Sequence, residues 1–387
     1  MTEKIFYKNP HQTEFDATVL QCSPTEDGNF WITLDCTAFF PEEGGQNADS
    51  GFLYKAGTSD ALRVLDVQIN EDTIYHKLST PLSPGEKVKG YVDWDKRFDY
   101  MQQHSGEHLI SGLVNRRYGY HNVGFHLGDE EVTLDFDGIL TLEELREIER
   151  EANRAITQDI PVHIYFPSKE ELAVLDYRSK IAIEGDVRIV EFPGYDVCAC
   201  CAPHVDTTGQ IGLIKVTGVM KHRGGIRVNI LCGNRAIADY TEKQDSVSSI
   251  SVQLSAKPDA VADAVARLKE ENVKQKNRMI ALQQQFLQYQ LASIPAEQEN
   301  VVLFFEDLDT PAMRDAVNTL CAMHTGYCAV FTGNDTDGYR YILGSLHRNC
   351  REASVLLSET FHARGGGSER MIQGSVNASE TEICNVF

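Results

Sequence analysis

The chain has 387 residues, of which 42% are hydrophobic and 24% are charged, and this is ordinary for a folded protein with two or three domains. No apolar run reaches the roughly 18 residues that a transmembrane helix needs, and the N-terminus has no basic segment followed by an apolar one. Membrane insertion and secretion are therefore not expected. The expected location is the cytoplasm. The net charge of −21 argues against a general nucleic-acid binder.

Residues 1–95 are expected to form a small N-terminal β-barrel. Runs rich in β-branched and aromatic residues are separated by turn sequences such as Glu26-Asp-Gly28 and Pro84-Gly85. The predicted strands cover 17–21, 30–34, 64–67 and 73–77. Between the second and third strands lies the segment Thr37-Ala-Phe-Phe-Pro-Glu-Glu-Gly-Gly-Gln46, whose paired glycines indicate a tight turn.

Residues 96–240 are expected to form a central α+β domain. Helical and strand patterns alternate in this block, and a capping box marks the start of its second helix. The predicted elements are a helix at 95–118, a strand at 132–136, a helix that begins at 141–144 and ends near 159, and short strands across 161–232.

Residues 241–295 are expected to form a helical linker. One long helical pattern covers 255–292, and its seam residues follow alternating four- and three-residue steps, as in a coiled coil. This seam fits an antiparallel hairpin, a homodimer contact or packing on the body of the protein, and Pro295 ends the pattern. The seam comprises Val261, Val265, Leu268, Asn272, Gln275, Met279, Leu282 and Phe286.

Residues 296–387 are expected to form a small α/β domain at the C-terminus. Apolar runs that predict buried strands alternate with helical stretches, and the block closes on a glycine-rich segment, 364–374. The predicted strands cover 301–305, 329–331, 341–343 and 353–357.

Two short segments carry metal-binding residue types. His104-Ser-Gly-Glu-His108 and Cys200-Cys-Ala-Pro-His204 each hold two ligands four positions apart, and on a helix that spacing places both on one face. Together they supply three imidazoles and one thiolate, a set well matched to Zn²⁺. The sequence therefore predicts one zinc ion per chain, bound by His104, His108, Cys200 and His204.

A competing interpretation uses only the first segment. His104 to His108 also fits the H-x-x-E-H pattern of inverted zincin metalloproteases, with Glu107 as the base. This interpretation leaves Cys200 and His204 without a role. Replacing Glu107 with glutamine is expected to abolish a protease, whereas replacing Cys200 with alanine would remove the metal from the two-pair site.

The remaining cysteines and basic residues give weaker signals. Cys198 and Cys201 flank Cys200, so spacing from His204 is what favours Cys200 as the ligand. A local basic patch follows the second metal pair and is suited to weak, salt-dependent RNA binding. It comprises Lys215, Lys221, His222, Arg223, Arg227 and Arg235.

Three motifs in this order resemble the AlaX family of freestanding alanyl-tRNA editing proteins, long subclass, and the editing domain of alanyl-tRNA synthetase. The segment 37–46 resembles the family's glycine-rich motif in the barrel. His104 to His108 and Cys200 to His204 resemble its H-x-x-x-H and C-x-x-x-H motifs. The segment 365–374 resembles the end of a DHHA1-type domain, so the resemblance spans nearly the whole chain.

The resemblance implies a zinc-dependent hydrolase that acts in trans on mischarged alanine tRNA. Serine is the expected wrong amino acid, and glycine is a second candidate. A pocket that hydrogen-bonds the serine hydroxyl can reject alanine, because its polar groups would otherwise stay unpaired. Thr37 matches a family threonine with this role, and His126 is a second candidate near the site.

The resemblance also implies contacts with tRNA. These are expected from Gly44 and Gly45, from basic residues of the central block, and from the C-terminal glycines, which otherwise form a flexible loop. The basic residues are Lys221, Arg223 and Arg227, and the glycines are Gly365, Gly366 and Gly367.

One motif departs from the family pattern. The synthetase commonly reads Cys-Gly-Gly-Thr-His where this chain has Cys200-Cys-Ala-Pro-His204, so Pro203 replaces a hydroxyl residue beside the metal. Four protein ligands would also close a tetrahedral zinc site, although catalytic zinc normally keeps one position open. A third interpretation therefore stays open, in which a structural zinc stabilises a module that binds tRNA or protein.

Overall fold

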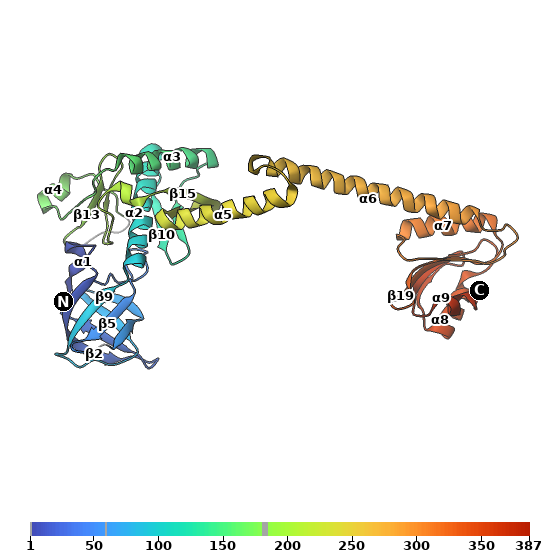
Figure 1. Ribbon diagram of the computed structural model, residues 1–387, viewed down its shortest axis with the longest axis horizontal. Helices are drawn as coiled ribbons and strands as arrows, with labels where there is room; N and C mark the ends of the chain where they lie inside the picture. Colours follow the sequence, from blue (N-terminus) through green and yellow to red (C-terminus); the bar gives the residue numbers. More distant parts are fainter. Residues whose placement is uncertain (1, 59, 180–184) are drawn as a thin grey trace. The chain divides into compact units, whose positions relative to one another are not determined.

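The computed structural model describes residues 2–58, 60–179 and 185–387. They form two compact units, Met1–Ser248 and Ser249–Phe387 (Figure 1). Both units contain helices and sheets whose strands are mainly antiparallel, so the predicted α+β class is confirmed. No helix within the described ranges combines the length and the apolar character needed to cross a bilayer.

The N-terminal part of the first unit is a seven-stranded sheet in the order β6-β5-β9-β2-β3-β8-β7. Its two outer strands are consecutive in the chain and are joined by Leu65 alone, whose amide donates to the carbonyl of Lys77 at 2.8 Å. The sheet must therefore curl until its edges meet, which gives the near-barrel that the sequence predicts. The strands are β2 (Glu14–Pro24), β3 (Phe30–Leu34), β5 (Gly51–Lys55), β6 (Ala61–Val64), β7 (Asp66–Asn70), β8 (Thr73–Leu78) and β9 (Lys87–Val92).

Short elements close one end of this near-barrel. β1 (Glu3–Lys4) pairs in parallel with β4 (Cys36–Thr37), and α1 (Ile5–Lys8) follows β1. Phe6 of α1 packs edge-on against Phe40, at 5.4 Å between ring centroids. The glycine-rich segment therefore begins inside the apolar core of the near-barrel.

Helix α2 (Trp94–Tyr118) joins the near-barrel to the central block. Its first turn is capped by Asp93, and it ends at Gly119 in the left-handed conformation, φ 71°. Arg97 and Asp49 form an ion pair in which both side chains are completely buried. Arg97 also donates to the carbonyls of Pro10 and Ala38, at 2.8 and 2.6 Å. One side chain thus joins the helix to three segments of the N-terminal part.

The central block packs α2 and α3 (Leu142–Gln158) against a sheet in the order β10-β11-β16-β15. Thr141 makes the predicted capping box with Glu144 at the start of α3. A second sheet has the order β12-β13-β14. The remaining bounds are β10 (Asn122–Leu127), β11 (Val132–Phe136), β12 (His163–Tyr165), α4 (Lys169–Val174), β13 (Ile189–Phe192), β14 (Asp196–Ala199), the 3₁₀ turn η1 (Thr208–Ile211), β15 (Ile214–His222) and β16 (Gly225–Cys232).

The helical pattern predicted at 255–292 corresponds to α6 (Val261–Ala292). A separate helix, α5 (Gly233–Leu254), precedes it and begins before the linker predicted at 241–295. Ser255 adopts a left-handed conformation, φ 50°, and Pro258 opens the short 3₁₀ turn η2 (Pro258–Ala260), so the helix cannot run through. On α6, the seam residues Leu268, Leu282 and Phe286 are each more than half exposed in the single chain.

The C-terminal part is a five-stranded sheet in the order β17-β18-β19-β21-β20. α7 and the end of α6 cover one face, and α8 and α9 cover the other. The segment predicted as a strand at 353–357 lies in α8, so that prediction is wrong: Ala353 and Leu357 are buried at helical spacing. The bounds are β17 (Val301–Phe305), α7 (Thr310–Met323), β18 (Cys328–Asn334), β19 (Gly338–Gly344), α8 (Cys350–Phe361), β20 (Arg364–Gly367), β21 (Met371–Val376) and α9 (Glu380–Cys384).

Candidate metal centre

The structure brings the two predicted ligand pairs together. One ligand atom from each of His104, His108, Cys200 and His204 lies within 4.8 Å of all the others. The two histidines are one turn apart on α2, and the other pair lies in the loop that follows β14. Segments almost a hundred residues apart therefore converge on one point, as the ligand types predict.

The hydrogen bonds of the three imidazoles leave the same nitrogen available in each ring. His108 donates from Nδ1 to the Asp196 carboxylate at 2.8 Å, and His204 donates from Nδ1 to the Ala202 carbonyl at 2.8 Å. Because these oxygens only accept, Nδ1 carries a proton in both rings and Nε2 is the nitrogen that faces the cluster.

The Nε2 atoms confirm this arrangement. Those of His108 and His204 are buried and have no hydrogen-bond partner among the residues the structure describes. His104 Nδ1 lies 2.8 Å from the side-chain oxygen of Gln46, and its Nε2 lies 3.5 Å from the sulfur of Cys200. Buried polar atoms without partners are costly, so this donor set fits a bound cation.

Local electrostatics separate Cys200 from its neighbours. Burial alone would raise the pKa of the Cys200 thiol, but the adjacent His104 and His204 rings hold it well below the usual value. Burial raises the pKa of Cys201, and the Cys200 thiolate adds to the effect. Burial also raises the pKa of Cys198. These directions favour Cys200 over Cys198 and Cys201 as the thiolate of the cluster, in agreement with its spacing from His204.

The histidines differ in their protonation. Burial lowers the pKa of His204 to about 3, so this ring is neutral. Burial acts the same way on His108, but its hydrogen bond to Asp196 and the nearby Cys200 thiolate outweigh it and raise its pKa to about 9. A cation would compete with a proton at His108, so metal uptake is expected to release a proton there.

A second layer of contacts fixes His108. Arg178 donates to both oxygens of the buried Asp196, at 2.6 and 2.7 Å. Burial alone would raise the pKa of Asp196, but its bonds to Arg178 and His108 lower it. Gly112 allows this approach, because a Cβ there would lie 2.6 Å from the Asp196 Cβ. Partners of this kind set the tautomer and the orientation of a ligand ring.

Replacing Asp196 with asparagine is expected to weaken metal binding by about 10- to 100-fold, because His108 loses its charged acceptor. Metal affinity should be measured by competition with a chromophoric chelator. Asp135→Asn is the matched control, since Asp135 also binds an arginine, Arg227, through two bonds but contacts no ligand. Equal losses in both variants would show that Asp196 acts only on general stability.

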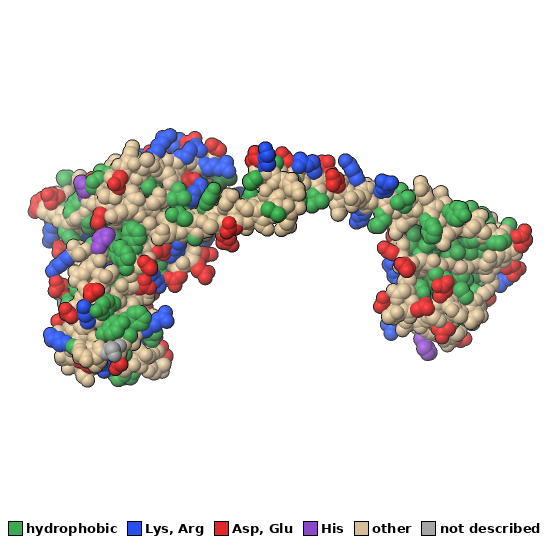
Figure 2. All heavy atoms as spheres, in the orientation of Figure 1, with side chains coloured by type: hydrophobic (Ala, Val, Ile, Leu, Met, Phe, Trp, Pro, Cys, Tyr) green, Lys and Arg blue, Asp and Glu red, His purple; other side chains and the backbone are tan. Residues whose placement is uncertain are grey.

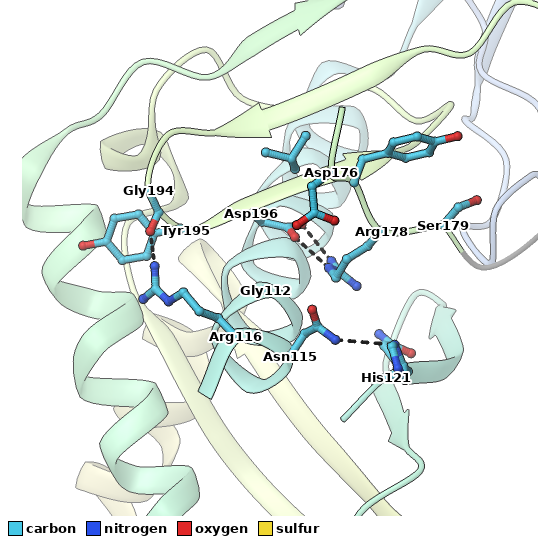
Figure 3. Close-up of a pocket in the computed structure, with 13 residues that line it drawn as sticks. Gly112, Asn115, Arg116, His121, Asp176, Arg178, Ser179, Gly194, Tyr195 and Asp196 are labelled. Atoms are coloured by element: carbon cyan, nitrogen blue, oxygen red, sulfur yellow. Dashed lines mark hydrogen bonds and ion pairs between the residues drawn. The ribbon is translucent and has the colours of Figure 1, made fainter. Parts of the chain in front are cut away.

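A cavity of about 640 Å³ adjoins this layer (Figure 3). Arg178 and Asp196 form one wall, and Asn115 and Arg116 of α2 face them (Figure 3). Asn122 also lines the cavity and donates to the Glu107 carboxylate at 2.6 Å. Glu107 is buried, with its other oxygen 3.9 Å from His108 Nε2. The cavity therefore borders the cluster through Asp196 and Asn122.

The paired glycines form the turn that carries Gln46 to the cluster. Gly44 and Gly45 both have positive φ, 64° and 83°. A Cβ at Gly45 would overlap the carbonyl oxygen of Phe125, and one at Gly44 would lie 3.2 Å from the Cys201 sulfur. The glycines therefore serve the packing of this turn against the metal centre.

Replacing Gly45 with alanine is expected to displace this turn and to lower stability by about 1 to 3 kcal/mol, because backbone strain and overlap add. Thermal unfolding and metal content should both fall. Gly28→Ala is the control: its φ is also positive, at 81°, but a Cβ there meets nothing within 4 Å. An equal effect in the control would assign the loss to strain alone.

Thr37 and His126 do not join the four-atom cluster. Thr37 is fully buried, and its hydroxyl lies 2.8 Å from Nε2 of His76. Burial lowers the pKa of His76 to about 4, so the ring is neutral and accepts the hydroxyl proton. His126 is exposed on β10, whereas the ring of its neighbour Phe125 lies 4.7 Å from that of His104.

The predicted basic patch is largely neutralised. Arg227 donates to both oxygens of Asp135, Lys215 pairs with Glu149, and Arg235 pairs with Asp99. Lys221 and Arg223 lie at the tip of the β15–β16 hairpin. The triple glycine 365–367 forms most of β20, an outer strand paired with β21, so the alternative of a flexible loop is wrong.

Sequence reasoning missed Gln46 and Asp196 as partners of the ligand histidines. Gln46 ends the glycine-rich segment, and its position beside a predicted motif was a usable signal. Asp196 lies four residues before Cys200 and carries no comparable signal.

Several known proteins are similar to this chain in sequence. Residues 187–229 match the family described as "Threonyl and Alanyl tRNA synthetase second additional domain", and residues 3–96 match "tRNA synthetases class II (A)". The alanine–tRNA ligase of Methanopyrus kandleri is 30% identical over 96% of this chain and 42% of its own length. The chain thus spans about two-fifths of the length of such ligases.

Freestanding proteins match over almost their whole length. The alanyl-tRNA editing protein AlaX-L of Pyrococcus horikoshii is 26% identical over 100% of this chain and 97% of its own. The alanyl-tRNA editing protein Aarsd1 of Rattus norvegicus is 27% identical over 95% and 92%. The chain is therefore a relative of the alanyl-tRNA synthetases. Within that class, the chain belongs to the AlaX family of alanyl-tRNA editing proteins.

Proposed function

We propose that this protein hydrolyses mischarged alanine tRNA in trans, with seryl-tRNA as the main substrate and glycyl-tRNA as a second one. The observation that carries the proposal is the cluster of His104, His108, Cys200 and His204 in a chain that matches freestanding editing proteins almost end to end. In the reaction, water adds to the ester carbonyl and the bond to the tRNA oxygen breaks. The products are the free amino acid and the 3′ or 2′ hydroxyl of the tRNA.

The four cluster residues would hold one zinc ion, which supplies Lewis-acid polarisation when bound. Their partners do the positioning: Gln46, Asp196 and the Ala202 carbonyl fix the three rings. Arg178 holds Asp196 in its charged form. The site is buried between the near-barrel and α2, which keeps bulk water away and strengthens these interactions.

Amino-acid discrimination is assigned to the near-barrel side of the centre. Thr37 gives its proton to His76 and accepts the amide proton of Phe39 at 3.1 Å, so one lone pair of its hydroxyl oxygen remains. Thr37 would therefore contact a serine hydroxyl as an acceptor. His126 is proposed as a second residue that contacts the substrate near the site. Contacts with the RNA outside the buried centre are proposed for Gly44, Gly45, Lys221 and Arg223, and for Gly365, Gly366 and Gly367.

The test uses alanine tRNA charged with serine, glycine or alanine, incubated with the protein with and without a chelator. We expect seryl-tRNA to be hydrolysed faster than alanyl-tRNA, and the chelator to abolish the difference. A peptide substrate, assayed in parallel, tests the inverted zincin alternative. If none of the three esters is cleaved faster than in buffer, the proposal is wrong.

The exposed seam of α6 supports a homodimer through the helical region. Leu268, Leu282 and Phe286 would bury their side chains against a second copy. Light scattering after gel filtration should give a molar mass twice that of the chain. In Leu282→Glu the measured mass should fall to that of a single chain.

A further inference from the structure

Three arginines form an exposed stripe along α3. Arg146, Arg150 and Arg154 follow one another at four-residue intervals, so they lie on one face of the helix, and all three are exposed. The rise of about 1.5 Å per residue places neighbouring members about 6 Å apart along the axis. Figure 2 shows Lys and Arg side chains gathered over α3.

The acidic residues of α3 do not neutralise this stripe. Glu151 binds Arg116 at 2.8 Å, Glu147 binds Arg117, and Glu149 binds Lys215. These carboxylates are thus paired with cations from other elements. No ion pair of Arg146, Arg150 or Arg154 occurs among the described residues. The three guanidinium groups are thus not held in ion pairs within the described part of a chain whose net charge is −21.

The stripe is linked to the cavity beside the metal centre through Arg116 of α2. Arg116 lines that cavity (Figure 3) and donates to Glu151 of α3, which follows Arg150 directly in the sequence. A polyanion bound along α3 would therefore lie close to Arg116, one of the residues that line the cavity beside Asp196.

We propose that the arginine stripe of α3, residues Arg146, Arg150 and Arg154, is a docking surface for the phosphate backbone of double-helical RNA. The inference rests on the proposed function for the identity of that RNA, the stem of the tRNA substrate. Regularly spaced guanidinium groups suit successive phosphates, which they bind through paired hydrogen bonds. The stripe contacts no base edge, so it positions the RNA and does not read its sequence.

The test measures binding of uncharged alanine tRNA to the full chain over a series of salt concentrations. The first variant is Arg146→Gln/Arg150→Gln/Arg154→Gln, in which we expect the affinity for tRNA to fall at least about tenfold. We also expect the slope of log affinity against log salt concentration to become shallower by about 2 to 3. Arg146→Lys/Arg150→Lys/Arg154→Lys should keep most of the slope, because it keeps the charge. Turnover of saturating seryl-tRNA should be unchanged while KM rises.

The matched control removes three other positive charges from the same unit. In Lys55→Gln/Lys87→Gln/Lys89→Gln we expect a much smaller effect, because these lysines already contact Glu86, Thr18 and Glu14. An equal loss in this control would overturn the proposal, since net charge alone would then explain it. Polyglutamate competing as well as tRNA would also overturn it, by assigning the stripe to acidic polypeptides.

Failure of this inference is distinguishable from failure of the proposed function. If the protein deacylates seryl-tRNA but the glutamine variant binds tRNA with wild-type affinity and salt slope, only the docking surface is wrong. If no charged tRNA is deacylated, the function is wrong, and the binding experiment still decides whether α3 holds RNA. Circular dichroism of each variant verifies that the fold is intact.

Discussion

Replacing Cys200 with serine is expected to abolish binding of the proposed zinc ion. The thiolate is the single anionic ligand of the cluster, and a neutral hydroxyl is a poor substitute for it. Loss of an outer contact such as Asp196 weakens a site by about 10- to 100-fold, so loss of the ligand itself should exceed about 100-fold. Metal content after dialysis and the rate of seryl-tRNA deacylation should fall together.

Cys201→Ser and Cys198→Ser are the matched controls for this experiment. Both residues neighbour Cys200 in the sequence, but the pKa of each thiol is raised, so each stays protonated. We expect both control variants to keep about one metal per chain. Loss of metal in Cys201→Ser with retention in Cys200→Ser would move the ligand by one residue and contradict the assignment.

Replacing Arg97 with methionine is expected to destabilise the first unit by about 3 to 5 kcal/mol, because it leaves the carboxylate of Asp49 buried without a counter-charge. The Asp49 carboxylate also accepts the amide proton of Phe40 at 2.6 Å, so it cannot easily turn towards water. Urea unfolding of the first unit, followed by its tryptophan fluorescence, measures the change.

The control for Arg97 is Arg117→Met. Arg117 also pairs with a glutamate, Glu147, but both side chains are more than a third exposed. Exposed pairs contribute about 0 to 1 kcal/mol, so this variant should unfold almost as the wild type does. A similar loss in both variants would refute the special role assigned to the buried pair.

The sequence predicted the parts of the fold that local patterns determine. The strands at 30–34 and 132–136 and the capped helix α3 formed where the alternation of residues and the Thr141 box placed them. The segment 353–357 failed because a run of apolar residues fits a strand as well as a helix, and only burial of Ala353 and Leu357 on one face decides. The break at Ser255 depends on a backbone conformation that its side chain does not signal.

The candidate ligand set was predictable because histidine and cysteine are typical zinc ligands, and both pairs show the four-residue spacing that brings two ligands together. The partners of the ligands were not, since Asp196 meets His108 only after β14 packs against α2. The prediction of the basic patch failed in a different way, because it selected cations that are paired in the structure. Counting cations in a window of sequence selected Arg227 and Lys215, which the fold pairs with carboxylates, and overlooked the helical spacing of Arg146, Arg150 and Arg154.

The length of α2 has a consequence for how a substrate enters. Arg97 anchors the first turn of this helix to the near-barrel. His104 and His108 follow about two and three turns later on the same uninterrupted helix. A hinge between the near-barrel and the metal centre would have to break a buried ion pair, so we expect the two to move as one body. Access of a tRNA end to the buried histidines would then depend on movement of the loops around the centre, and not on separation of the near-barrel from α2.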